Sequence, residues 1–237
     1  MLTDDIVVKD DFFDKELISQ LWKECLDNDH KGEDFVDHHG IWKGHRVSRQ
    51  QFIRRYDDLN NHNNNYNFSP AVKEIENIVL NEFEDGVFIR EMTFQQLYLP
   101  WDIHCDLTRE DIAQNNACKS HGIENYTPFY NVLIPLHDVD SRTMVFQQES
   151  TEYNDFWRFK ENNPKADTPV DKSLWDEYLD MCWPDDREWL TIKKILPAQK
   201  AGQLIAFKRN FFHSSDNFHK RNIASKHFIQ ILLDKNN

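Results

Sequence analysis

Three potential metal ligands lie far apart in the sequence and constrain its fold. His104 and Asp106 are separated by one residue, and His213 lies far along the chain. Side chains of a β-strand alternate between its two faces, so residues spaced by one project to the same side. His104 and Asp106 can therefore bind one ion together on a strand, with Cys105 pointing away. Bringing His213 to the same ion requires a strand that returns beside the first, which predicts an antiparallel barrel or sandwich.

The residue types of these ligands indicate a kind of site. Two histidines and one carboxylate on one face of an octahedral metal form the facial triad of non-heme Fe(II) sites, which leaves the other positions open. The His-x-Asp spacing is weak evidence by itself, because the sequence holds 11 histidines and 41 acidic residues. Its value depends on the segments around it.

Segments typical of β-strands surround the three ligands. Runs of apolar, β-branched and aromatic residues between polar stretches predict strands. Such runs cover residues 92–99 before His104, residues 131–136 and 143–147 after Asp106, and residues 226–233 after His213. This order of strands and ligands is the one that a barrel around a single metal ion requires.

In these residues the sequence resembles the Fe(II)- and 2-oxoglutarate-dependent dioxygenases. That family carries His-x-Asp, a distal histidine and a basic residue near the start of the next strand, all on a double-stranded β-helix. The resemblance covers about residues 90 to 233, and is greatest to uncharacterised phage and marine-bacterial members. It implies that His104, Asp106 and His213 are the catalytic metal ligands, that Fe(II) and 2-oxoglutarate are the cofactors, and that the core is a jelly roll.

Asp106 bears on the type of reaction within the family. Members that halogenate have a small residue in place of this carboxylate, which leaves room for a halide. The carboxylate is present here. The resemblance therefore implies hydroxylation, or another oxidation that begins with hydrogen abstraction, with release of succinate and CO2.

The resemblance also implies a cation that pairs with the distal carboxylate of 2-oxoglutarate, and two residues are candidates. Lys226 opens the last apolar strand and shares a face with Phe228 and Gln230, which places it toward the interior. Arg221 is closer to the distal histidine and can bind a carboxylate through two parallel hydrogen bonds, which lysine cannot. Because Arg221 lies in a polar stretch before the strand, we favour Lys226 and keep Arg221 as the alternative.

We expect one domain over residues 1–237, of the α+β class and mainly β. Residues 1–88 are expected to be a mainly helical flanking region, and residues 89–237 the β-helix core. Apolar residues at helical spacing predict a helix over residues 12–22, and Ser69 followed by Pro70 predicts the start of another that runs to Phe83. The polar residues 57–65 between them are expected to form turns.

An insert of about residues 150–190 interrupts the core strands and is rich in aromatic residues. Its tryptophans are Trp157, Trp175, Trp183 and Trp189. Two interpretations are open. The aromatics pack the insert onto the barrel as ordinary core, which we favour, or they form a cap over the substrate, as long inserts in compact enzymes often do.

Charge and cysteine pattern restrict the partners and the compartment. The formal net charge of −13 argues against tight binding to a phosphate backbone. A local basic strip is nevertheless expected beside the site, composed of Lys208, Arg209, Lys220, Arg221 and Lys226. No apolar segment is long enough for a membrane, and the four cysteines lack Cys-x-x-Cys spacing. We expect a soluble cytoplasmic protein with free thiols.

Other functions stay open at this stage. One is a cupin-like metal-binding barrel, or a non-enzymatic binding module, that does not use 2-oxoglutarate. Another is a structural or interaction protein in which the His-x-Asp spacing arises by chance. The sequence does not identify the substrate, for which a small molecule or a peptide is expected, and it leaves the oligomeric state open. His121, His137, His219 and His227 are expected to be surface histidines.

Overall fold

The computed structural model describes residues 4–38, 40–55, 69–107, 126–150 and 156–236. The polar residues 57–65, for which turns are expected, lie outside these ranges, as do Cys118 and His121.

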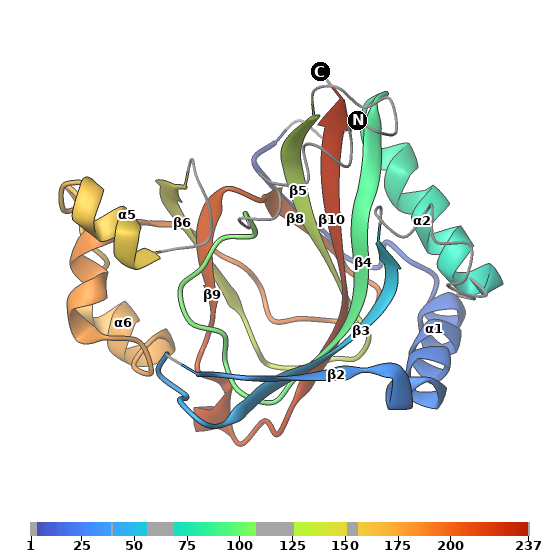
Figure 1. The fold of residues 1–237 in the computed structure, drawn as a ribbon, viewed down its shortest axis with the longest axis horizontal. Helices are drawn as coiled ribbons and strands as arrows, with labels where there is room; N and C mark the ends of the chain where they lie inside the picture. Colours follow the sequence, from blue (N-terminus) through green and yellow to red (C-terminus); the bar gives the residue numbers. More distant parts are fainter. Residues whose placement is uncertain (1–3, 39, 56–68, 108–125, 151–155, 237) are drawn as a thin grey trace.

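Two antiparallel sheets face each other across the centre of the molecule (Figure 1). The larger sheet has the strand order β1-β8-β5-β10-β4-β3-β2, and the smaller has the order β7-β6-β9. The strands of the larger sheet are β1 (Ile6–Lys9), β2 (Glu33–Val36), β3 (Arg46–Arg55), β4 (Val87–Leu97), β5 (Tyr126–Pro135), β8 (Leu204–Lys208) and β10 (Lys226–Asn236). Those of the smaller sheet are β6 (Thr143–Glu149), β7 (Ile192–Ile195) and β9 (Phe211–Ser215). This double-stranded β-helix confirms the predicted fold class.

Two helices cover the outer face of the larger sheet (Figure 1). Helix α1 (Lys15–Asp27) begins after Asp14, whose carboxylate accepts the first free backbone N–H groups, and α2 (Pro70–Glu82) begins after Ser69, whose hydroxyl does the same. Their buried faces share one apolar core with the outward residues of the strands. Both helices lie where the sequence predicts them, with α1 shifted toward its C-terminal end.

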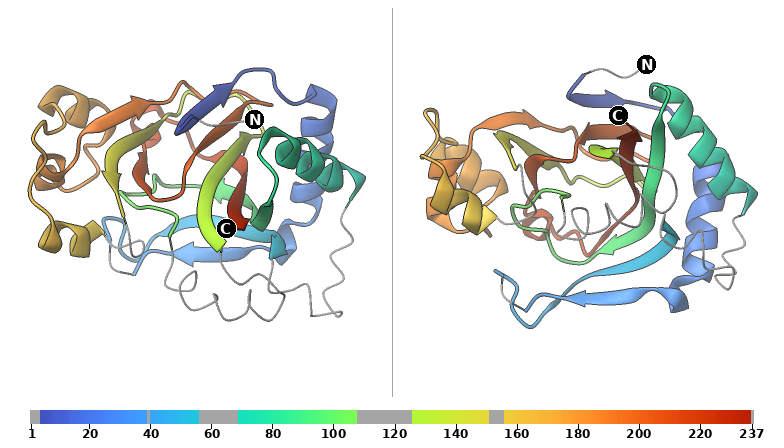
Figure 2. Two further views of the ribbon diagram at one scale, coloured as in Figure 1. Left: turned by 90° about the horizontal axis from the view of Figure 1, so that it is seen from above. Right: turned by 45° about the horizontal axis from the view of Figure 1, so that its top comes forward.

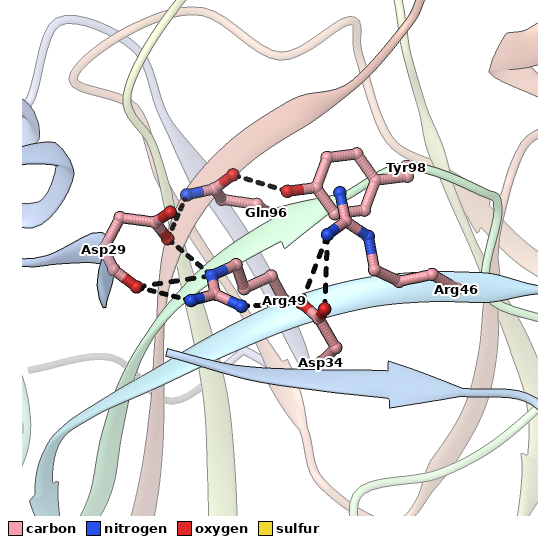
Figure 3. A network of polar contacts seen from close by, with 6 residues as sticks. All are labelled: Asp29, Asp34, Arg46, Arg49, Gln96 and Tyr98. Carbon is pink, nitrogen blue, oxygen red and sulfur yellow. Dashed lines mark hydrogen bonds and ion pairs between the residues drawn. The ribbon is translucent and has the colours of Figure 1, made fainter. Parts of the chain in front are cut away.

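The region before residue 89 differs from the mainly helical one that the sequence predicts, because it contains strands β1, β2 and β3 as well as the two helices. Strand β3 has the sequence RVSRQQFIRR, whose many polar residues conceal the alternation of a strand. A polar network attaches the edge strand β2 and the short helix η1 (Asp29–Lys31) to β3 and β4 (Figure 3). In it Arg49 binds Asp29 and Asp34, and Gln96 donates to Asp29 at 2.8 Å.

The aromatic insert packs on the opposite side of the barrel from α1 and α2 (Figures 1 and 2). It holds α5 (Phe156–Asn162), α6 (Lys172–Tyr178) and the short helix η3 (Pro184–Trp189). Trp175 is 2% exposed, in one apolar cluster with Phe146 and Phe212 of the smaller sheet. In the part of the insert that the structure describes, no residue lines the central pocket. The contacts of Trp175 therefore support the packed-core interpretation.

Cys25, Cys105 and Cys182 are buried, and none of the three forms a disulfide. Across the described residues, none of the helices combines the length and the apolar character that crossing a membrane requires.

Candidate metal centre

His104, Asp106 and His213 come together in the structure. Each offers one potential ligand atom, and these atoms all lie within 4.8 Å of one another. His213 Nε2 is 3.4 Å from the Oδ2 atom of Asp106. The three residues predicted from the sequence thus form a cluster with the composition of a facial triad.

The backbone positions the two histidines opposite each other. His213 lies on β9, and His104 pairs with it in an isolated antiparallel bridge with N···O distances of 3.0 and 2.7 Å. The His104 segment thereby extends the smaller sheet by one position next to β9. The expectation that His104 and Asp106 lie on a regular strand is wrong, because only His104 of this segment makes a bridge, and Asp106 lies in a bend.

Hydrogen bonds orient both imidazole rings toward a common point. His104 Nδ1 lies 2.6 Å from the carbonyl oxygen of Asp102, and His213 Nδ1 lies 3.1 Å from that of Phe211. A carbonyl only accepts, so each Nδ1 carries a proton, and in the neutral ring Nε2 is then the nitrogen that presents a lone pair. Burial lowers the pKa of His213 to about 4, so it is neutral near pH 7. Neutral rings with a fixed tautomer are the form that binds a metal.

Asp106 is fixed through both its backbone and its side chain. Its carbonyl oxygen accepts hydrogen bonds from Nε and Nη2 of Arg209 at 3.2 and 2.8 Å, and its N–H donates to the carbonyl of Arg209 at 3.0 Å. Its carboxylate accepts from Asn131 Nδ2 at 2.6 Å and from Gln230 Nε2 at 3.4 Å. Arg209 is fully buried and paired with Asp234 of β10, which is also fully buried.

The three ligands line a pocket between the sheets with a volume of about 230 Å³. Strand β10 supplies one wall through Lys226, Phe228, Gln230 and Leu232, the alternating set that the sequence places on the inner face. Strands β3, β4 and β5 contribute the amide side chains of Gln50, Gln95 and Asn131, respectively. The pocket therefore joins the metal centre to a mixed polar and apolar wall.

Among the described residues, Lys226 is the one lysine or arginine that lines this pocket. It is 2% exposed, and its Nζ donates to the hydroxyls of Ser215 at 2.9 Å and Ser141 at 3.4 Å. Burial lowers the pKa of its ammonium to about 8, which the nearby carboxylate of Asp216 partly opposes. An ammonium has three N–H donors, so one donor is left for an anionic ligand.

Arg221, the alternative candidate, lies behind Lys226 and outside the pocket lining. Its guanidinium pairs with the buried carboxylate of Asp216 and donates from Nε to the carbonyl of Asp140 at 2.8 Å. Asp216 in turn accepts from Ser141, the hydroxyl that Lys226 contacts. Arg221 thus supports the surroundings of Lys226 without facing the metal ligands.

The basic strip that the sequence suggests does not gather at the pocket. Lys208 pairs with Asp5, Lys220 with Asp180, and Arg209 is held inside the protein. Carboxylates from other parts of the chain neutralise these cations, which local sequence cannot reveal.

His227 faces away from the pocket, as alternation predicts, but it is not a solvated surface residue. Its ring and its backbone N–H both lie 3.1 Å from Nε2 of His137, and Trp22 of α1 stacks on His137 with 5.2 Å between ring centroids. Burial lowers the pKa of His227 to about 4 and also lowers that of His137. The expectation that these two histidines are solvated at the surface needs correction, because packing against Trp22 leaves both half-buried.

Sequence reasoning missed most of the residues that surround the ligands. Strand alternation on β10 places Gln230 on the inner face, and the same alternation on β4 and β5 would have placed Gln95 and Asn131 there. No sequence signal indicates that Arg209 and Asp234 pair, since Arg209 lies in the turn after β8, and β5 separates β8 from β10 in the sheet.

Comparisons with known proteins find likeness in structure and none in sequence. No protein-family model and no curated protein matches the chain. The epimerase SnoN, solved with Fe3+, alpha ketoglutarate and nogalamycin RO, has a TM-score of 0.55 at 10% identity, with 97% of this chain and 78% of that chain covered. The carbocyclase SnoK has a TM-score of 0.55 at 12% identity, with 98% and 80% covered. A Pseudomonas putida prolyl-4-hydroxylase has a TM-score of 0.51 at 13% identity, with 99% and 95% covered.

The chain has the fold of the 2-oxoglutarate-dependent oxygenases. This oxygenase fold spans nearly the whole sequence, including the region before residue 89. The roles of individual residues rest on the contacts of this chain.

Proposed function

We propose that the protein is an Fe(II)- and 2-oxoglutarate-dependent oxygenase. The observation that carries the proposal is the cluster of His104, Asp106 and His213 at the pocket, where both Nδ1 atoms are hydrogen-bonded to backbone carbonyls and both Nε2 atoms are left for a metal. Two neutral imidazoles and one carboxylate suit Fe(II) and leave positions for other ligands. When bound together, Fe(II) and 2-oxoglutarate activate dioxygen, and the 2-oxoglutarate leaves as succinate and CO2.

In this proposal Lys226 binds the distal carboxylate of 2-oxoglutarate. It lines the same pocket as the metal ligands, is buried, and has a donor available beside Ser215. An ion pair in a buried site is strengthened by the low local dielectric. Arg221 is already bound to Asp216, so it acts behind Lys226 and does not contact the co-substrate.

Other residues of the pocket hold Asp106 in position. Asn131 and Gln230 hold the carboxylate of Asp106, and Arg209 holds its backbone. Since Asp106 is a carboxylate, the site lacks the open halide position of halogenating relatives, and hydroxylation of a small molecule or a peptide is the finer proposal. A cupin-like barrel without 2-oxoglutarate is the second candidate, because the triad alone would serve it equally.

The first experiment is an anaerobic titration of Fe(II)-loaded protein with 2-oxoglutarate, followed by visible absorption. We expect the weak charge-transfer band of a co-substrate chelated to iron. Asp106→Ala and His213→Ala should lose iron and band together, whereas Lys226→Ala should keep its iron and lose the band at concentrations that saturate the wild type. Unchanged iron content in Asp106→Ala would show that the ligand set is wrong.

Arg221→Ala is the matched control for Lys226→Ala. It also removes one cation from the same network but leaves the pocket lining intact, so the band should persist. If folded, iron-loaded wild type gives no band, the cupin-like candidate is favoured. Succinate formation from 2-oxoglutarate and dioxygen without added substrate then tests catalysis itself.

A further inference from the structure

Three amide side chains on neighbouring strands form one wall of the pocket. Asn131 lies on β5, Gln230 on β10 and Gln95 on β4, and β10 lies between the other two strands in the sheet. All three line the pocket. We call this set the amide wall.

The carboxylate of Asp106 determines which way each amide points. A carboxylate only accepts hydrogen bonds, so the atoms that face it must be the NH2 groups of Asn131, at 2.6 Å, and Gln230, at 3.4 Å. The oxygen of Gln230 then faces away from Asp106 and accepts from Nε2 of Gln95 at 3.2 Å. That same Nε2 donates to the hydroxyl of Thr93 at 3.0 Å. The orientation of Gln95 therefore follows from Asp106 through Gln230.

Within the amide wall, this arrangement leaves two acceptors without a partner among the described residues, and Gln199 elsewhere in the pocket lining also has an unpartnered Oε1 and Nε2. The two acceptors of the amide wall are Oδ1 of Asn131 and Oε1 of Gln95. Their side chains are buried, with exposed fractions of 1% and 4% for the two residues. A buried oxygen without a hydrogen bond destabilises the protein, so two such atoms at one pocket indicate that a ligand completes them.

The co-substrate does not suit these acceptors. 2-Oxoglutarate carries two carboxylates and a ketone, which are acceptors as well, and acceptor faces acceptor without a hydrogen bond. Its anionic end is instead matched by the ammonium of Lys226. The amide wall is therefore left to the substrate.

We propose that the amide wall recognises the substrate, which presents two hydrogen-bond donors to Asn131 Oδ1 and Gln95 Oε1. The proposal rests on the proposed function and names its substrate class: a polar molecule with hydroxyl, amino or amide N–H groups beside the C–H bond that is oxidised. A hydrocarbon leaves both oxygens without partners, and a carboxylate or phosphate opposes them. Sites built to bind such donors reject analogues without them by roughly 10⁴-fold.

Gln95 gives the cleanest variant, because it contacts Gln230 and not Asp106. Gln95→Met keeps the length of the side chain and removes its oxygen, and Gln95→Glu keeps an acceptor. The matched control is Gln51→Met on the adjacent strand β3. Gln51 is also buried, with an unpartnered Oε1 among the described residues, but it does not line the pocket.

The test uses protein loaded with Zn(II) and 2-oxoglutarate and observes ligands by saturation-transfer NMR. The probes are pairs of diols, amino alcohols and primary amides with their O- or N-methylated counterparts at millimolar concentration. Donor-bearing members should bind wild type and Gln51→Met, whereas their methylated partners should not. In Gln95→Met, the affinity of the bound members should fall about tenfold, as expected for one lost hydrogen bond. Gln95→Glu should retain the amino alcohols.

The proposal would be overturned by methylated members that bind as well as their partners, or by equal affinity in Gln95→Met and wild type. Absence of binding by every donor-bearing probe would overturn it too. The Fe(II) and 2-oxoglutarate band separates this failure from that of the proposed function. Gln95→Met should keep the band, because this residue does not contact the co-substrate. Absence of the band in wild type would instead contradict the proposed oxygenase function.

Discussion

Arg209 holds the backbone of Asp106, the carboxylate residue of the candidate metal centre, since two of its guanidinium nitrogens donate to the carbonyl oxygen of Asp106. The third nitrogen pairs with Asp234, and both charged side chains are fully buried. A buried ion pair is weak evidence for a gain in stability, because desolvation offsets the attraction. Its position indicates instead that the pair holds the bend of Asp106 in place.

Arg209→Met should therefore weaken iron binding as well as the fold. It leaves Asp234 buried without its partner, for which we expect a loss of about 3–5 kcal/mol in the free energy of unfolding. Metal affinity should fall about 10- to 100-fold, as for residues that orient ligands. Urea unfolding and calorimetric titration with Mn(II) measure the two effects.

The double variant Arg209→Met/Asp234→Leu separates the effect on stability from the effect on metal affinity. With both charges removed, most of the stability should return, whereas the carbonyl of Asp106 still lacks its donors and the metal affinity should stay low. Full recovery of metal affinity in the double variant would show that Arg209 acts only on the fold.

The affinity for 2-oxoglutarate should depend on pH through Lys226. Burial lowers the pKa of this ammonium to about 8, so the free protein loses the cation as the pH rises through that value. If only the charged form binds, affinity should be about tenfold weaker at pH 9 than at pH 7. Arginine stays charged, so Lys226→Arg should give a flat profile even if its affinity is lower. A flat profile in wild type would contradict the role of Lys226.

Acid should destabilise the fold through the covered histidines. The pKa of His227 is lowered by burial to about 4 from 6.5, and that of His137 is also lowered. The unfolded chain therefore binds more protons than the folded one between these values, and the free energy of unfolding should decrease as the pH falls from 6.5 to 4. His213 acts in the same direction.

Replacement of His227 by Phe should make this decrease shallower, as measured by urea unfolding at several pH values. Phenylalanine suits the neighbouring rings of Trp22 and Phe94. The exposed His219 is the matched control, and His219→Gln should keep the wild-type slope. If the free energy of unfolding depends on pH equally in all three proteins, the half-buried histidines are not the cause of that dependence.

Replacing each of two tryptophans of the insert by alanine should have very different effects on the free energy of unfolding. Trp175 is 2% exposed in the cluster that also holds Ile103, next to His104, and its loss should lower the free energy of unfolding by about 3–5 kcal/mol. Trp157 is 68% exposed, and its loss should change stability by about 0.5 kcal/mol or less. Chemical unfolding measures both. A large effect on substrate turnover in a stable Trp157→Ala would revive the cap interpretation.

The pairing of His104 with Asp106 could be predicted because its information is local, whereas His213 was added through the resemblance to a known family. His-x-Asp and the strand that carries Lys226 are short patterns with fixed geometry, and both lead to the same pocket. The prediction that His104 lies on a regular strand was wrong for a different reason. The segment is held by pairing with His213 and by the grip on Asp106, which are contacts between distant parts of the chain.

Long-range pairing also explains the other misses. The basic strip looks continuous in sequence, but Lys208, Arg209 and Lys220 each find a carboxylate elsewhere. His137 and His227 are polar residues at positions that alternation assigns to the outside, yet Trp22 covers them. Which helix lies over which face is decided by the fold as a whole, and no local pattern specifies it.

The central place of β10 has a consequence for how the protein is made. This strand is the last in the sequence, yet it lies between β4 and β5 in the larger sheet and carries both Lys226 and Asp234. During synthesis, β4 and β5 leave the ribosome well before the strand that joins them. Such late, non-local pairing is slow and leaves apolar edges exposed. We therefore expect the facing edges of β4 and β5 to stay unpaired until β10 has been synthesised.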